Sequence, residues 1–152
     1  MSAERIISGT GRTLAPGDLG KPQRTWLIAG RVLTGLAAAF LLMDSVTKVV
    51  APAWVAANSP DIGWSLDPVT IRSLGTLLLI PTVLYLWPRT ALLGAILITG
   101  YLGGAIATHA RIGSPLLTHT LFGVYLALFV WGGLWLRSPA LRALMPIVST
   151  KD

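Results

Sequence analysis

Four long runs of apolar residues divide the chain, and short segments rich in proline and charge separate them. The clearest run, 91–108, carries no charged side chain. Its length is about the minimum for a membrane-spanning helix, since roughly 17 to 25 apolar residues are needed. At about 1.5 Å per residue it covers about 27 Å, close to the thickness of the hydrocarbon core. The pattern therefore predicts a transmembrane helix over 91–108.

The same criterion predicts three further spanning helices, at 29–50, 69–87 and 116–136. Asp67 followed by Pro68 is typical of a helix start, because an N-cap acceptor precedes a proline at the first helical position. The connections between the runs are short, which favours antiparallel neighbours. The expected fold class is all-α: an integral membrane bundle of four transmembrane helices in up-down order.

The expected domain organisation is simple. Residues 1–25 are rich in glycine, proline and basic side chains, a composition typical of a disordered tail. Residues 26–146 form one four-helix transmembrane domain, and 147–152 form a short tail. Four spanning helices use most of the chain, so one compact unit is expected, and no internal repeat of 20–50 residues is visible.

Composition agrees with a membrane location. The chain is 53% hydrophobic and 12% charged, whereas a soluble domain carries about 25% charged residues. The net charge of +6 does not indicate nucleic-acid binding, because the basic residues flank the apolar runs instead of forming one basic face. The absence of cysteine excludes disulfides and thiolate chemistry within this chain.

The basic residues predict the orientation. If the N-terminus is cytoplasmic, the 12 Lys and Arg residues all lie on the inner side except Lys48, Arg72 and Arg111. An excess of Lys and Arg marks cytoplasmic loops. Both termini are therefore expected in the cytoplasm.

The segment from Phe40 to Pro146 resembles the DoxX-like family of small four-helix membrane proteins. The residues that carry this resemblance are Asp44-x-x-x-Lys48 with Pro52, RSLGTLLLIPTVLYLWPRTALLGAILITGYLGGAIATH, HARIGSPLLTH and WGGLWLRSPALRALMP. The resemblance implies the four-helix fold and the bacterial cytoplasmic (inner) membrane. It implies function only loosely, since members are linked to thiosulfate:quinone oxidoreductase subunits and to oxidative-stress complexes. Similarity to the thiosulfate-oxidising members is remote, so that activity is not carried over.

Alternating helix directions place a set of polar side chains at the outer end of the bundle. Ionisable residues at membrane depth are costly and usually face the bundle interior and pair. We therefore expect one polar, ligand-binding cluster beneath the outer surface. Its candidate residues are Asp44, Lys48, Arg72, His109 and His119.

Each candidate also has a purely structural interpretation. Asp44 and Lys48, one helical turn apart, can neutralise each other. Arg72 can reach lipid phosphate, and the two histidines can serve as interfacial hydrogen-bonding residues. The spacing matches no metal motif, so no metal site is expected. The one ligand kept open is a quinone, whose carbonyl oxygens a histidine would bond while Arg72 or Lys48 stabilises developing negative charge.

A second pattern concerns small residues. Gly100 and Gly104 form a GxxxG motif with Gly103 beside them, and Gly35 lies four residues before Ala39. Such surfaces let helices approach closely. We expect these glycines to pack helices within the bundle, with a dimer interface as the alternative.

Three function classes follow. The leading one is a non-catalytic membrane subunit or scaffold for a partner. The alternatives are a quinone-binding redox component and a carrier of small solutes or lipids. No catalytic motif indicates an enzyme. The expected partners are membrane lipids and either a membrane protein or a second copy of the chain, with no nucleic acid.

Overall fold

The computed structural model describes residues 21–58, 63 and 67–145 of the chain, and every element in this part is a helix. The all-α prediction is confirmed. The elements are α1 (Lys21–Val50), α2 (Ala53–Asn58), α3 (Pro68–Leu86), α4 (Ala91–Arg111), the π-helical turn η1 (Leu116–Thr120), α5 (Phe122–Arg137) and α6 (Pro139–Leu144). Residues 1–20 of the tail expected over 1–25, and the tail expected over 147–152, lie outside the described residues.

Four helical segments are long and apolar enough to cross a membrane, as predicted. They are Arg24–Val50, Pro68–Leu86, Ala91–Arg111 and Leu116–Arg137, the last formed by η1 and α5 together.

Two of the spans differ from their predicted bounds by three residues or more, and the other two by one residue. Residues 21–25 belong to α1 and not to a tail, because Pro22 is tolerated in the first turn of a helix and no breaker follows it. α4 continues three residues past 108 to Arg111. The next helix breaker is Gly113, whose positive φ of 67° ends the segment.

The start of α3 follows the predicted signature. The Asp67 carboxylate accepts hydrogen bonds from the backbone N–H groups of Val69 (2.9 Å) and Thr70 (3.0 Å), and Pro68 opens the helix. These bonds satisfy two amides that have no partner inside the helix.

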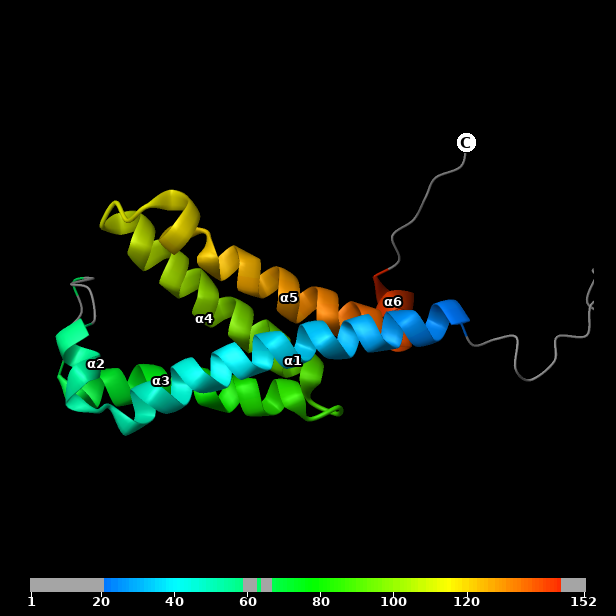
Figure 1. Cartoon of the computed structure of the whole chain (residues 1–152), viewed down its shortest axis with the longest axis horizontal. Helices are drawn as coiled ribbons and strands as arrows, with labels where there is room; N and C mark the ends of the chain where they lie inside the picture. Colours follow the sequence, from blue (N-terminus) through cyan, green and yellow to red (C-terminus); the bar gives the residue numbers. More distant parts are fainter. Residues whose placement is uncertain (1–20, 59–62, 64–66, 146–152) are drawn as a thin grey trace, which may run out of the picture.

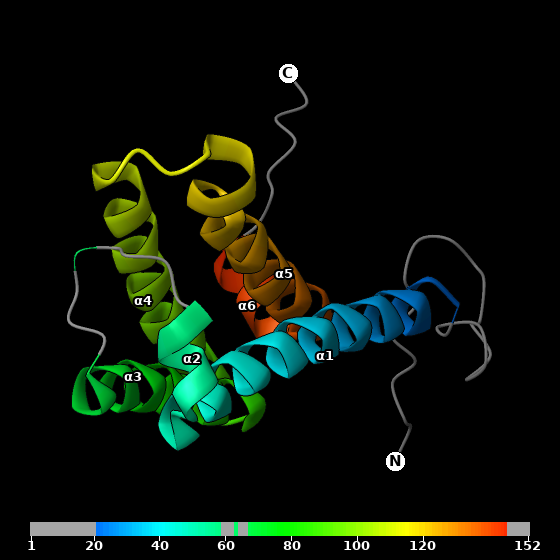
Figure 2. The same ribbon diagram turned by 60° about the vertical axis from the view of Figure 1, so that its left-hand side comes forward.

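In Figure 1, α1 runs beside α3 in one arm, and α4 lies beside α5 in a second arm. α1 also packs closely along α5, and this contact joins the two arms. The arms meet where α1 begins and α5 ends, and they diverge toward α2 and η1, as the second view also shows (Figure 2). We call the closed side, which carries Arg24, Arg89 and Arg137, the arginine end. We call the open side, where α1 and α4 end and η1 begins, the histidine end.

Glycines close the arginine end. A Cβ on Gly94 would lie 2.6 Å from the Cα of Tyr85, so α4 and α3 touch through their backbones. A Cβ on Gly133 would lie 2.7 Å from the Thr34 hydroxyl, which places α5 directly against α1. Only residues without a side chain permit such approaches.

A buried tyrosine links three helices at this end. The hydroxyl of fully buried Tyr85 donates to the Val130 carbonyl (2.9 Å) and lies 3.2 Å from the Thr34 hydroxyl. The Arg137 guanidinium donates to the Tyr85 carbonyl (3.2 Å) and sits 5.3 Å from the centre of its ring. Polar bonds thus fix α1, α3 and α5 together where the arms meet.

Candidate functional site

A cavity of about 800 Å³ lies between α3 and α4, where the arms diverge. α3 contributes apolar residues, α4 contributes both apolar and polar residues along one face, and α1 contributes one lysine. The lining residues are Lys48, Leu74, Leu77, Ile80, Pro81, Ile96, Leu97, Gly100, Tyr101, Gly104, Ala105, Thr108 and His109.

The walls of this cavity reach the surface that would face lipid. Leu77 and Ile80 of α3 are 60% and 57% exposed, and Ile96 and Leu97 of α4 are 52% and 43% exposed. In a bilayer these side chains contact acyl chains. The cavity therefore lies along the surface that would face lipid.

Two glycines of α4, Gly100 and Gly104, line the floor of the cavity. A Cβ on Gly100 or Gly104 would meet no atom within 4 Å, so the space beside them is open. Opposite them, Pro81 lies inside α3 and lacks the N–H that would bond the Leu77 carbonyl. Both Pro81 and Leu77 line the cavity, so this wall holds a carbonyl without its helical partner.

The polar part of the cavity is built on Lys48. Its ammonium donates to the Asp44 carboxylate at 2.5 Å, and the two side chains are 29% and 32% exposed. Gly75 of α3 positions Lys48, because a Cβ there would lie 2.7 Å from the lysine Cβ. Tyr101 of α4 also lines the cavity, near enough to this pair to interact with it electrostatically.

The two histidines meet at the turn between α4 and η1. Their ring centres are 5.9 Å apart. His109 Nδ1 lies 3.0 Å from the Ser114 hydroxyl, and His119 Nδ1 lies 2.8 Å from the Thr118 hydroxyl. The π-helical turn, closed by the Leu121 amide on the Leu116 carbonyl, brings His119 back over His109. Within the described residues, no three His, Cys, Asp or Glu side chains gather as a metal site would require.

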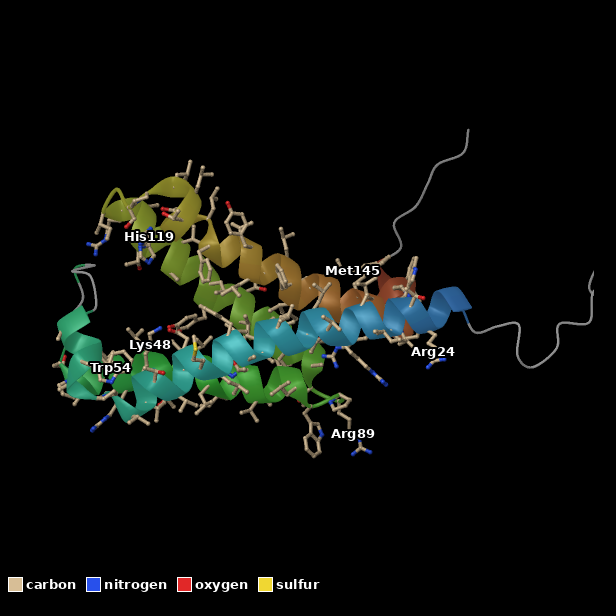
Figure 3. The ribbon with its side chains drawn as sticks, in the orientation of Figure 1. Arg24, Lys48, Trp54, Arg89, His119 and Met145 are labelled. Carbon is tan, nitrogen blue, oxygen red and sulfur yellow. The ribbon has the colours of Figure 1, made fainter. Side chains whose placement is uncertain are left out.

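The predicted cluster is only partly assembled. All five candidates lie toward the histidine end, yet they form three separate groups: the Asp44–Lys48 pair, the two histidines, and Arg72 alone. Figure 3 shows Lys48 on the arm of α1 and His119 on the arm of α4 and η1. Arg72 is exposed, and no described residue bonds its guanidinium. Of the five, only Lys48 and His109 line the cavity.

Tyr101 lines the cavity and is absent from the five candidates that the sequence suggested. A usable signal was present, because the α4 residues in the cavity recur at helical spacing and form one stripe. Its polar members are Tyr101, Thr108 and His109. Tyr101 and His109 are eight residues apart, which places them on the same helix face.

The glycines predicted to pack helices lie on open helix surface in the part of the chain that the structure describes. A Cβ on Gly35, Gly100, Gly103 or Gly104 would meet nothing there within 4 Å. Other glycines make the close contacts, namely Gly30, Gly75, Gly94, Gly123 and Gly133. The GxxxG spacing marks a flat helix surface without specifying its neighbour.

Four apolar spans in two arms, with a cavity open to lipid between them, define a small polytopic membrane protein of the helical-bundle class. A family model described as the DoxX-like family matches residues 32–133, which include most of α1 and all of α3 and α4. The chain therefore belongs to the DoxX-like family. Neither the curated proteins nor the solved structures contain a match.

Proposed function

We propose that this protein binds a quinone-type ligand in the cavity between α3 and α4 and acts as a membrane redox component. The observation that carries the proposal is the combination of an apolar, lipid-facing cavity with four polar side chains from two helices, namely Lys48, Tyr101, Thr108 and His109. The Thr108 hydroxyl already donates to the Gly104 carbonyl, which leaves Lys48, Tyr101 and His109 as donors to a ligand. The volume of about 800 Å³ falls within the roughly 300–1,000 Å³ of small-molecule sites.

The chemistry of the lining suits such a ligand. Quinone carbonyl oxygens accept hydrogen bonds, and the Lys48 ammonium, the Tyr101 hydroxyl and a ring nitrogen of His109 can donate them. Asp44 holds Lys48 in place through its ion pair. The isoprenoid tail would lie along Leu77 and the other apolar side chains, continuous with the lipid.

The test measures quinone retention. The full chain is reconstituted in nanodiscs with a short-chain ubiquinone, and the bound quinone is quantified after washing. Gly104→Leu places a side chain in the open floor and should lower retention at least tenfold, since the space is occupied. Gly103→Leu is the matched control, because it adds the same side chain to α4 at a glycine that does not line the cavity.

Wild-type retention no greater than that of empty nanodiscs would refute the proposal. So would equal retention by Gly104→Leu and the wild type. Lys48→Met separates the polar contribution from the shape of the cavity and should weaken binding without abolishing it, because the apolar contacts remain.

A second candidate function, a membrane subunit that docks on a partner helix, rests on Gly103. This residue is exposed, has no neighbour within 4 Å and does not line the cavity. Gly103→Leu should abolish co-purification of a partner while leaving quinone retention intact. A carrier is less well supported, because the cavity lies at the divergent part of the bundle and the arginine end is closed by backbone contacts.

We also propose the bacterial inner membrane as the location, with both termini cytoplasmic. The support is charge: Arg24, Arg89, Arg137 and Arg142 lie at the arginine end, and cytoplasmic loops favour such residues. Because the chain has no cysteine, single substitutions report orientation cleanly. Pro88→Cys should be shielded from an impermeant maleimide in intact cells, and Ile112→Cys should react. The reverse pattern would overturn the orientation.

A further inference from the structure

The corner between α5 and α6 holds an arginine beside a pair of neighbouring tryptophans. The Cζ of Arg142 lies 5.5 Å from the Trp26 ring centre and 6.0 Å from that of Trp135. Its Nη1 donates to the Leu136 carbonyl at 2.8 Å. The guanidinium is thus held by two aromatic faces and one backbone acceptor.

The surroundings fix this arrangement. The rings of Trp26 and Trp135 are 5.9 Å apart, and the Trp135 indole N–H donates to the Met145 carbonyl (3.3 Å). The Ser138 hydroxyl caps α6 by accepting from the Leu141 amide (3.2 Å). Leu141 is buried and anchors the short helix beneath Arg142. The arginine is therefore ordered without an ion pair.

No carboxylate balances this charge in the described part of the chain. The acidic residues there are Asp44 and Asp67, both at the histidine end. A guanidinium carries five N–H donors in a planar fork. Arg142 uses one of them in the bond to Leu136, so most of its donors are left for an external acceptor. The neighbouring Arg137 adds a second positive charge at the same corner.

We propose that Arg142, with Trp26 and Trp135, binds the phosphate head group of an anionic phospholipid. A planar fork matches the paired oxygens of a phosphate, and aromatic rings of this kind favour the membrane–water interface. Leu144 and Met145, 74% and 57% exposed, lie beside the site, where acyl chains would cover them. This neighbouring apolar surface favours a lipid over a soluble phosphate. The site is separate from the α3/α4 cavity.

The experiment measures lipid binding to the full chain in mild detergent by native mass spectrometry. Phosphatidylglycerol and phosphatidylcholine are titrated in parallel. The wild type should bind phosphatidylglycerol more tightly. Arg142→Gln should weaken that binding roughly tenfold, the size expected for a charge-assisted hydrogen-bond pair. Arg89→Gln is the matched control, because it removes the same charge from the exposed α3–α4 turn at the same end.

Equal losses in Arg142→Gln and Arg89→Gln would overturn the proposal, since diffuse electrostatics would then explain the binding. Arg142→Lys keeps the charge and loses the planar fork, so its affinity should fall between those of Arg142→Gln and the wild type. Wild-type affinity in Arg142→Lys would overturn the geometric argument. Displacement of the lipid by millimolar inorganic phosphate would overturn the choice of a lipid as the source of the phosphate.

Discussion

Gly94 offers the sharpest test of the packing. In the turn region between α3 and α4, a Cβ on this residue would overlap the Tyr85 nitrogen. It would also lie 2.6 Å from the Tyr85 Cα and 2.8 Å from the Leu84 carbonyl carbon. These atoms are backbone and cannot rotate away. Gly94→Ala must therefore push α4 from α3 by at least about 0.8 Å to bring the Tyr85 Cα to an ordinary contact of 3.4 Å, and the nearer Tyr85 nitrogen requires more.

The magnitude follows from a comparison within one helix. Forcing an extra carbon into a close contact costs about 1–3 kcal/mol. Replacing glycine by alanine inside a helix stabilises the folded state by about 0.5–1 kcal/mol, because alanine has the higher helix propensity. Gly100→Ala gains the same stabilisation, and its new Cβ meets no atom within 4 Å. The propensity gain is therefore the same in both variants, and the contact alone should make Gly94→Ala about 1–3 kcal/mol less stable than Gly100→Ala.

The free energy of unfolding can be measured by titrating SDS into mixed micelles and following far-UV circular dichroism. Gly100→Ala should unfold at or above the wild-type midpoint, and Gly94→Ala well below it. Equal midpoints for the two variants would refute the helix contact. Repeating the titration at two protein concentrations separates self-association along α4 from intramolecular packing, because only self-association depends on concentration.

Two further predictions concern polar contacts. In a double-mutant cycle of Thr34→Val and Tyr85→Phe, the unfolding midpoints should give a coupling energy of about 0.6 kcal/mol, typical of hydrogen bonds between membrane helices. A coupling of zero would mean that the 3.2 Å contact does not contribute. Asp44→Asn leaves Lys48 unpaired and should cost about 1–2 kcal/mol, and adding Lys48→Met should restore most of that loss. A double variant less stable than Asp44→Asn would contradict this interpretation.

The spans and the end at which each polar residue lies were predictable from the sequence. The length and apolarity of each run predicted a helix, and Asp67 with Pro68 predicted the start of α3. Alternating helix directions then placed His109 and Lys48 at the same end. These inferences depend on chain length and direction alone, which the bilayer thickness constrains tightly.

The side of the helix that each residue occupies was not predictable. In a soluble helix an apolar stripe marks the buried face, but a membrane helix is apolar on both its packed and its lipid-facing sides. The sequence therefore could not distinguish Gly94, which touches Tyr85, from Gly100, which touches nothing. For the same reason it could not show that Arg72 lies apart from Lys48.

The contrast between glycines at close helix contacts and glycines with no neighbour within 4 Å explains why the bundle has a cavity. Gly75 holds α3 against α1, and Gly123, whose Cβ would lie 2.8 Å from Ile106, holds α5 against α4, so each arm is closely packed within itself. Gly94 and Gly133 join the arms at the arginine end. Toward the histidine end Phe40 and Phe122, with ring centres 5.1 Å apart, bridge α1 and α5, while the cavity lies between α3 and α4. The helices thus pack closely on the other sides of the bundle, and the cavity remains between α3 and α4. The polar residues at the histidine end of the cavity lie where the two arms have separated.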